Sequence, residues 1–185
     1  MYGAVAVLCC PKTMKMYMIV MLVLGLSSPA VSAPAAGKVT GQMMINGTAY
    51  KLTHVYARAV PDPFDERGVD IQVILSDVAI SAEDRASEEN REKLATAGKL
   101  HAMELLLGGD PIRPVFNDIY DAAFNGSQQP MRLTGLAKFE TKTNNRKTIA
   151  GRHFMASAHN FGDMGNGVTF QDDVTFSAPV ARLQK

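Results

Sequence analysis

The chain has 185 residues, of which 19 are lysine or arginine and 18 are aspartate or glutamate, so its formal net charge is +1. This near-neutral balance argues against a nucleic-acid-binding domain, which needs a concentrated basic surface, and against strong binding to anionic membranes. The length suits one domain with a substantial core.

An apolar run near the start of the chain indicates where the protein goes. It extends from Met16 to Leu26, with lysines before it and small residues after it, which is the layout of a secretory signal peptide. The run is too short to span a membrane, which takes roughly 20 residues. We expect residues 1–35 to be a signal peptide with a spurious extension over 1–13, cleaved after Ala35 in preference to Ala33. The alternative is a buried apolar segment of the fold.

Cleavage there changes the composition of the remaining chain. Both cysteines, Cys9 and Cys10, lie in the removed part, as do Lys12 and Lys15, and no acidic residue does. Residues 36–185 then carry 17 basic and 18 acidic side chains, a net charge of −1, and no cysteine. We expect this single β-rich domain to be held together by its core, without disulfides.

Alternating apolar and polar residues predict strands in the first third of this domain. A strand over 41–45 is followed by Asn46-Gly47, a strong hairpin signal because both residues tolerate a positive φ. The return strand is expected over 48–60, with His54 on the face of the even-numbered residues, and it ends at a proline pair. A third strand is expected over 69–75.

A helix is expected near residues 82–97, because this segment is charged, rich in helix formers and followed by glycine. Ser81 or Ser87 is the expected N-cap, and the acidic residues come early, as the helix dipole favours. Leu94 is the one large apolar residue of the segment, so we expect this helix to lie on the surface.

Further strands are expected to the end of the chain, with a glycine-rich loop over 159–167. Residues 115–124 suit a short helix as well as strands, and strands are preferred because the neighbouring segments are strands. The other expected strands are 99–107, 131–140, 148–156 and 168–180. These elements predict a mainly β fold, an antiparallel sandwich or barrel of about eight strands with one surface helix.

Three short motifs carry a resemblance to a family. Leu52-Thr-His-Val-Tyr-Ala57, Asp62-Pro-Phe-Asp65 and Val73-Ile-Leu-Ser-Asp77 resemble the H-x-Y-A … DPFD … LLSD pattern of uncharacterised secreted bacterial proteins. The resemblance implies an exported bacterial domain and no particular activity. It marks five candidate ligand-binding residues: His54, Tyr56, Asp62, Asp65 and Asp77.

Asp172 falls on the apolar face of the last expected strand. A carboxylate there must be paired if it is buried, and Arg58 and Arg152 are the candidate partners. The alternative is a bulge at Asp172-Asp173 that exposes both side chains.

Catalytic and metal motifs are weak throughout the sequence. His153, His159 and Asp163 are near enough in sequence for an open zinc site, but no spacing typical of zinc ligands supports one. The acidic loops at 62–66 and 163–166 do not match a calcium loop and suit turns. We expect no catalytic residue, metal or cofactor.

These observations favour a periplasmic or secreted, non-enzymatic β-domain with no membrane span and no nucleic-acid partner. We expect it to bind a small or apolar ligand, or a protein partner, through a barrel mouth or an exposed sheet face. The alternatives are a hydrolase that uses His54 with a nearby carboxylate, and a structural envelope protein that pairs through an edge strand.

Overall fold

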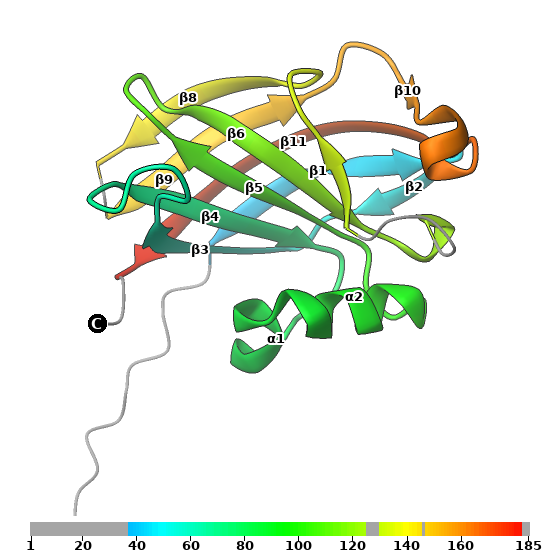
Figure 1. Cartoon of the computed structure of the whole chain (residues 1–185), viewed down its shortest axis with the longest axis horizontal. Helices are drawn as coiled ribbons and strands as arrows, with labels where there is room; N and C mark the ends of the chain where they lie inside the picture. Colours follow the sequence, from blue (N-terminus) through cyan, green and yellow to red (C-terminus); the bar gives the residue numbers. More distant parts are fainter. Residues whose placement is uncertain (1–36, 125–129, 146, 183–185) are drawn as a thin grey trace, which may run out of the picture. The chain divides into compact units, whose positions relative to one another are not determined.

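The structure is a computed structural model that describes residues 37–124, 130–145 and 147–182. The predicted signal peptide lies outside the described residues. The described strands form a mostly antiparallel sheet that curls into a half-barrel, with two short helices against its outer face (Figure 1). The prediction of a mainly β fold with about eight strands is confirmed, since the main path of the sheet is β2-β1-β11-β3-β4-β5-β6-β7.

The element bounds are as follows. The strands are β1 (Lys38–Ile45), β2 (Thr48–Lys51), β3 (His54–Pro61), β4 (Val69–Ser76), β5 (Ala102–Gly108), β6 (Arg113–Tyr120), β7 (Met131–Leu133), β8 (Lys138–Asn144), β9 (Thr148–Phe154), β10 (His159–Asn160) and β11 (Thr169–Ala181). The helices are α1 (Ala82–Ala86) and α2 (Glu88–Thr96), with 3-10 turns η1 (Ala122–Phe124) and η2 (Gly162–Gly165).

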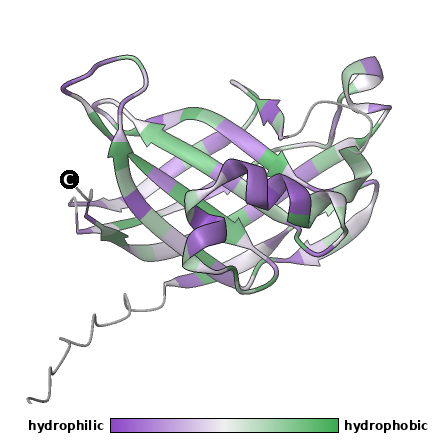
Figure 2. Cartoon of the chain, turned by 60° about the horizontal axis from the view of Figure 1, so that its bottom comes forward, coloured by the Kyte–Doolittle hydropathy of each residue, from purple (hydrophilic) through white to green (hydrophobic). Residues whose placement is uncertain are grey.

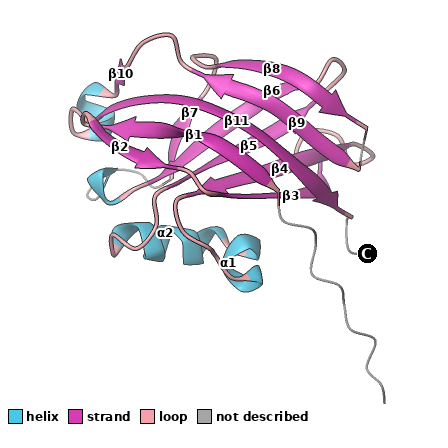
Figure 3. Cartoon of the chain, turned by 180° about the vertical axis from the view of Figure 1, so that it is seen from behind, coloured by secondary structure: helices cyan, strands magenta, loops and turns pink. Residues whose placement is uncertain are grey.

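The long strand β11 joins the two halves of the sheet. It pairs antiparallel with β1 along one edge and with β9 along the other. Its last residues run parallel to β3, with Val180 opposite Ala57. The pairs β1–β2 and β8–β9 therefore flank β11 on its two edges, and β3 to β7 continue the sheet from the last residues of β11 (Figure 3).

The chain between β2 and β3 changes its pairing partner. The hairpin at Asn46-Gly47 forms as predicted, with both residues at positive φ. After it, the Leu52 N–H donates to the Gly41 carbonyl on β1, but the next N–H, of Thr53, donates to Ser76 on β4. The prediction of one continuous strand over 48–60 is therefore wrong.

This change also reverses the alternation of the side chains. Leu52 and Val55 both point into the core, although one is even-numbered and the other odd-numbered. His54 consequently shares the outer face of the half-barrel with Tyr56, and does not share a face with Leu52. The reason is that Leu52 and Thr53 belong to no strand, so the two-residue period is broken there.

The main core lies inside the curl. It is built from the inward residues of both halves of the sheet, and it includes Met43, Val73, Leu105, Ile119, Phe170 and Phe176. Along β11 the even-numbered residues from Phe170 to Ala178 are buried, as the alternation predicted. The sheet curls because this brings the apolar side chains of its inner face together and removes them from water.

Two helices stand where the sequence predicted one. Ser81 accepts the Asp84 N–H to cap α1, and Ser87 both ends α1 and accepts the Asn90 N–H to cap α2. Hydrophilic residues cover the outward side of the pair (Figure 2). A small second core lies beneath the helices, formed by Ile74, Ile80, Ala95, Leu100, Ala102 and Tyr120.

Other boundaries differ from the prediction. The expected strand over 131–140 is two strands, because Gly135 at positive φ interrupts it. The segment over 115–124 is strand as far as Tyr120 and then a 3-10 turn. The expected loop over 159–167 contains the short strand β10 and the turn η2.

Candidate ligand-binding site

The five predicted site residues do not form one site. His54 begins β3, whereas Asp62 and Asp65 lie just beyond its other end. A strand of this length spans about 25 Å. His54, Tyr56 and Asp77 are therefore near one end of the half-barrel, and the two aspartates of the β3–β4 loop are at the opposite end.

Asp62 and Asp65 hold the β3–β4 loop in shape. The Asp62 Oδ1 accepts the N–H groups of Phe64 and Asp65 at 2.7 and 3.2 Å, and the Asp65 Oδ1 accepts the Arg67 N–H at 3.0 Å. These are bonds from aspartate to nearby backbone, typical of turn residues. Both side chains thereby position Arg67 and Gly68, which do line a pocket.

His54, Tyr56 and Asp77 are also engaged locally. The His54 Nδ1 lies 2.9 Å from the Thr53 hydroxyl, and the Tyr56 hydroxyl accepts the Ile80 N–H at 3.3 Å. The Asp77 Oδ1 accepts the His101 N–H at 3.0 Å. None of the three lines the pocket at the other end of β3.

A pocket of about 750 Å³ opens at the end of the half-barrel where β3, β5, β8 and β11 finish. This end is on the left in Figure 1, close to the C-terminal label. Its apolar lining comes from Ala59, Val69, Ile71, Leu107, Ile112 and Val180. Its polar lining comes from Arg67, Asp110, Asn144 and Arg182.

Small residues leave this space open. Ala59 faces inward on β3 directly opposite Ile71 on β4, while Gly108 ends β5 and Gly109 follows it. A larger side chain at Ala59 would occupy the pocket. The sequence carried a signal of this, since the inward residues of β3 shrink from Val55 to Ala57 and Ala59, but the predicted face assignment obscured it.

Asp70 lies beside the pocket on the outer face of β4. It is 3% exposed, and its Oδ2 has no hydrogen-bond partner among the described residues. Burial, and secondarily the carboxylate of Asp62, raises the pKa of Asp70. Gly108 is directly across from it on β5, and a Cβ at Gly108 would collide with the carboxylate.

Asp172 is buried inside the half-barrel, and neither predicted arginine is its partner. Its Oδ2 lies 2.6 Å from the Nδ1 of His153, and the Nε2 of His153 lies 2.8 Å from the Asn117 amide nitrogen. Arg152 instead binds Asp173 through two hydrogen bonds on the outer face. The bulge alternative is wrong too, because β11 keeps its alternation through both aspartates.

A second histidine–carboxylate pair lies at the end of the half-barrel opposite the pocket. The His101 Nδ1 is 2.5 Å from the Asp121 Oδ2, and the imidazole stacks on Tyr50 with ring centroids 3.8 Å apart. Burial, followed by the charges of Asp121 and Asp77, raises the pKa of Tyr50. The sequence did not single out this pair, because His101 directly precedes β5 and Asp121 directly follows β6, 20 residues later.

The three candidate zinc ligands of the sequence analysis, His153, His159 and Asp163, do not form a metal site. His153 is fully buried and contacts Asp172 and Asn117. His159 instead packs edge-on against Phe161, with 5.1 Å between the ring centroids. Within the described residues, no group of three or more histidine, cysteine or acidic side chains is arranged to hold a metal ion. The hydrolase alternative required a carboxylate beside His54, but the hydrogen-bond partner of its imidazole is the Thr53 hydroxyl. Among the described residues, the histidines that contact carboxylates are His101, which pairs with Asp121, and His153, which pairs with Asp172.

No helix in the described part of the chain is long and apolar enough to cross a bilayer. Comparisons with protein-family models, curated proteins and solved structures find no match to this chain. The candidate sites therefore rest on the geometry of the chain itself.

Proposed function

We propose that the protein is a non-enzymatic binding domain that takes up a small ligand with an apolar body at the open end of the half-barrel. The pocket of about 750 Å³ between β3, β4, β5 and β11 is the observation that carries the proposal. Ligand sites in proteins have volumes of roughly 300–1,000 Å³ and largely apolar walls. Ile71, Leu107 and Val180 supply such walls.

The polar residues at the rim suggest the other part of the ligand. Arg67 is 95% exposed and its Nε is 3.9 Å from Asp65, a distance at which an exposed ion pair contributes little. Its guanidinium is therefore available to an anionic group, as is that of Arg182 on the same pocket. We propose an aliphatic carboxylate, whose chain would gain about 0.8 kcal/mol for each buried methylene.

A titration with 11-(dansylamino)undecanoic acid, a fluorescent fatty acid, tests this proposal. We expect saturable binding by the wild-type protein and roughly tenfold weaker binding by Ala59→Leu, which corresponds to about 1.4 kcal/mol. The matched control is Ala150→Leu, which places the same bulk on the outer face of β9. Equal affinities for these two variants, or no binding by the wild type, would contradict the proposal.

We also propose that binding takes place in the periplasm or outside the cell, on the strength of the apolar run from Met16 to Leu26. Native mass spectrometry of protein isolated from its own host tests both the ligand proposal and the export proposal. An added mass of a few hundred daltons would support a carried ligand, and the denatured mass would reveal any cleavage site.

A further inference from the structure

Two large apolar side chains face water beside the mouth of the pocket. Phe64, in the β3–β4 loop, is 81% exposed, and Val69, which begins β4 and lines the pocket, is 59% exposed. In the described part of the chain, the one large apolar residue with an exposure similar to that of Phe64 is Met164, at 78%. Met164 belongs to η2, before β11 begins and thus at the end of the half-barrel opposite the pocket (Figure 1).

The β3–β4 loop holds Phe64 outward in a defined conformation. The Phe64 N–H donates to the Asp62 Oδ1 at 2.7 Å. The ends of the loop are joined by the Asp62 N–H, which donates to the Gly68 carbonyl at 3.1 Å, and the Gly68 N–H donates to the Asp65 carbonyl at 2.8 Å. These bonds leave the Phe64 ring in water, and apolar side chains exposed within a polar rim are typical of an interaction surface.

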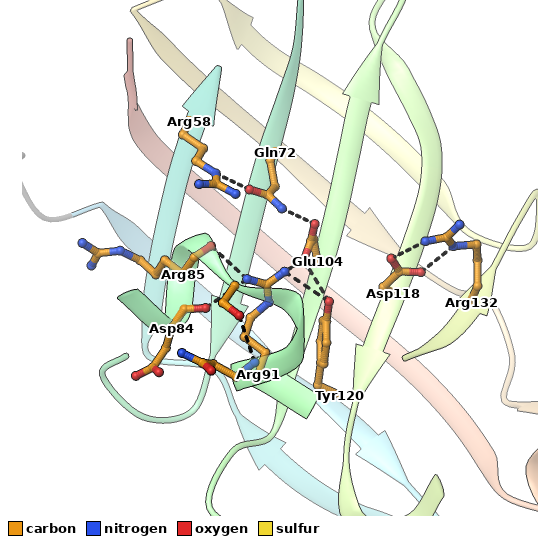
Figure 4. A network of polar contacts seen from close by, with 11 residues as sticks. Arg58, Gln72, Asp84, Arg85, Arg91, Glu104, Asp118, Tyr120 and Arg132 are labelled. Atoms are coloured by element: carbon orange, nitrogen blue, oxygen red, sulfur yellow. Dashed lines mark hydrogen bonds and ion pairs between the residues drawn. The ribbon is translucent and has the colours of Figure 1, made fainter. Parts of the chain in front are cut away.

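The outer face of the sheet next to this end offers no such surface. The helices α1 and α2 cover it, and hydrophilic residues form their outward side (Figure 2). Beneath the helices, Glu104 accepts hydrogen bonds from Arg91 at 2.7 Å and from Tyr120 at 3.1 Å, and from the Gln72 amide (Figure 4). A partner that recognises apolar groups would therefore contact the pocket mouth and not this face.

Charged side chains of both signs surround the mouth in similar numbers. They come from the β3–β4 loop, from the pocket lining and from the start of β6. The cations are Arg67, Arg113 and Arg182, and the anions are Asp62, Asp65, Glu66 and Asp110. Such a mixture suits a zwitterionic lipid headgroup, which carries one phosphate and one ammonium, and it gives no strong attraction to an anionic surface.

The apolar area at the mouth is too small for a stable protein partner. A specific protein interface buries roughly 800 Å² on each side. Phe64 and Val69 together offer much less, since even a buried aromatic side chain contributes only about 150–250 Å². A bilayer needs no complementary shape, because its acyl chains accept projecting apolar side chains while its headgroups contact the charged rim.

We propose that the pocket mouth docks on a zwitterionic lipid bilayer, with Phe64 and Val69 inserted at the boundary of the acyl chains. This inference rests on the proposed function, because it makes the bilayer the source or the destination of the ligand. The aliphatic carboxylate then passes between the acyl chains and the pocket while the two are in contact, and its apolar chain does not cross water.

The sequence contains no tryptophan, so a single introduced tryptophan reports on the mouth alone. Phe64→Trp is the probe, and Met164→Trp is the matched control at a similarly exposed position. Protein isolated after export is titrated with phosphatidylcholine vesicles. We expect the Phe64→Trp emission to shift to shorter wavelength and to be quenched by brominated acyl chains, and the Met164→Trp emission to stay unchanged. Both variants should melt like the wild type, because neither side chain belongs to an apolar core.

Ligand transfer measures exchange by contact. Protein loaded with 11-(dansylamino)undecanoic acid is mixed with phosphatidylcholine vesicles that contain an NBD-labelled lipid, which quenches dansyl fluorescence. We expect the transfer rate of the wild type to rise with vesicle concentration, and Phe64→Ser to lower this dependence roughly tenfold by removing the inserted ring. Phe64→Ser should bind the fatty acid like the wild type, because Phe64 does not line the pocket.

Several outcomes would overturn the proposal. They are an unchanged Phe64→Trp emission, the same shift in both tryptophan variants, a shift that requires anionic lipid, and a transfer rate that does not depend on vesicle concentration. A shift that follows protein concentration without vesicles would place a second copy of the chain at the mouth instead. The tryptophan measurement uses no fatty acid, so failure of the fatty-acid titration and failure of docking are distinguishable.

Discussion

Asp70 shows how one side chain makes stability depend on pH. Its carboxylate is buried and its Oδ2 is unpartnered in the described structure, and burial raises its pKa above the unfolded value. The folded state therefore binds a proton more tightly than the unfolded state does. The unfolding free energy should consequently fall as the pH rises from the unfolded pKa, near 3.9, through the folded pKa.

We predict that Asp70→Asn removes this dependence. The variant should gain about 1 kcal/mol over the wild type at neutral pH, where the wild type must bury an unpaired charge. Urea unfolding of both proteins at several pH values would measure the difference. Asp65→Asn, in the exposed β3–β4 loop, is the control, and a gain that is the same at every pH would contradict the explanation.

At the scale of elements, Arg91 attaches the helices to the sheet. Its Nη2 binds Glu104 at 2.7 Å, and its Nη1 donates to the carbonyls of Asp84 and Arg85 in α1. Burial lowers the pKa of Arg91, but Glu104 and Tyr120 outweigh this and the net shift is upward. Burial, together with Glu104, raises the pKa of Tyr120, so its hydroxyl remains a donor.

We predict that Arg91→Met destabilises the protein by about 3 kcal/mol, because it leaves the Glu104 charge buried without its partner. Lys93→Met, which breaks the exposed pair between Lys93 and Glu89 on the same helix, should cost less than about 0.5 kcal/mol. Chemical denaturation measures both. The explanation would fail if Arg91→Met combined with Glu104→Leu were no more stable than Arg91→Met alone.

At the scale of the whole molecule, the two cores differ in size. The inner core runs through both halves of the sheet, whereas the core beneath α1 and α2 contains only a few side chains within the described structure. Regions that bury little apolar surface open at lower free energy than the rest of a protein. The helices should therefore detach without unfolding of the half-barrel.

Hydrogen exchange followed by mass spectrometry measures this opening. We predict that peptides from 82–97 exchange faster than peptides from β4 and β5, and that Arg91→Met accelerates the helical peptides most. Uniform exchange across helices and strands would show instead that the molecule opens as one unit.

The alternation of residues predicted most of the strands but not the faces of all of them. The phase of β11 followed from its sequence, since Phe170 to Ala178 alternate without interruption. The phase of β3 did not, because the chain changes partner at Leu52 and Thr53, and pairing partners are not encoded in a local pattern. His54 was accordingly predicted to share a face with Leu52 as well as with Tyr56, and only the second holds.

The sequence by itself determined the local structure: the Asn46-Gly47 hairpin, capping by serine, and a mainly β fold with a charged helical segment on its surface. The tertiary structure alone decided which polar side chains meet. His153 binds Asp172 and Asn117 from three different strands, and the pocket draws its walls from five. The physical reason is that hairpin and cap signals act over a few neighbouring residues, whereas these contacts depend on sheet register and curl, which the packing of the whole core sets.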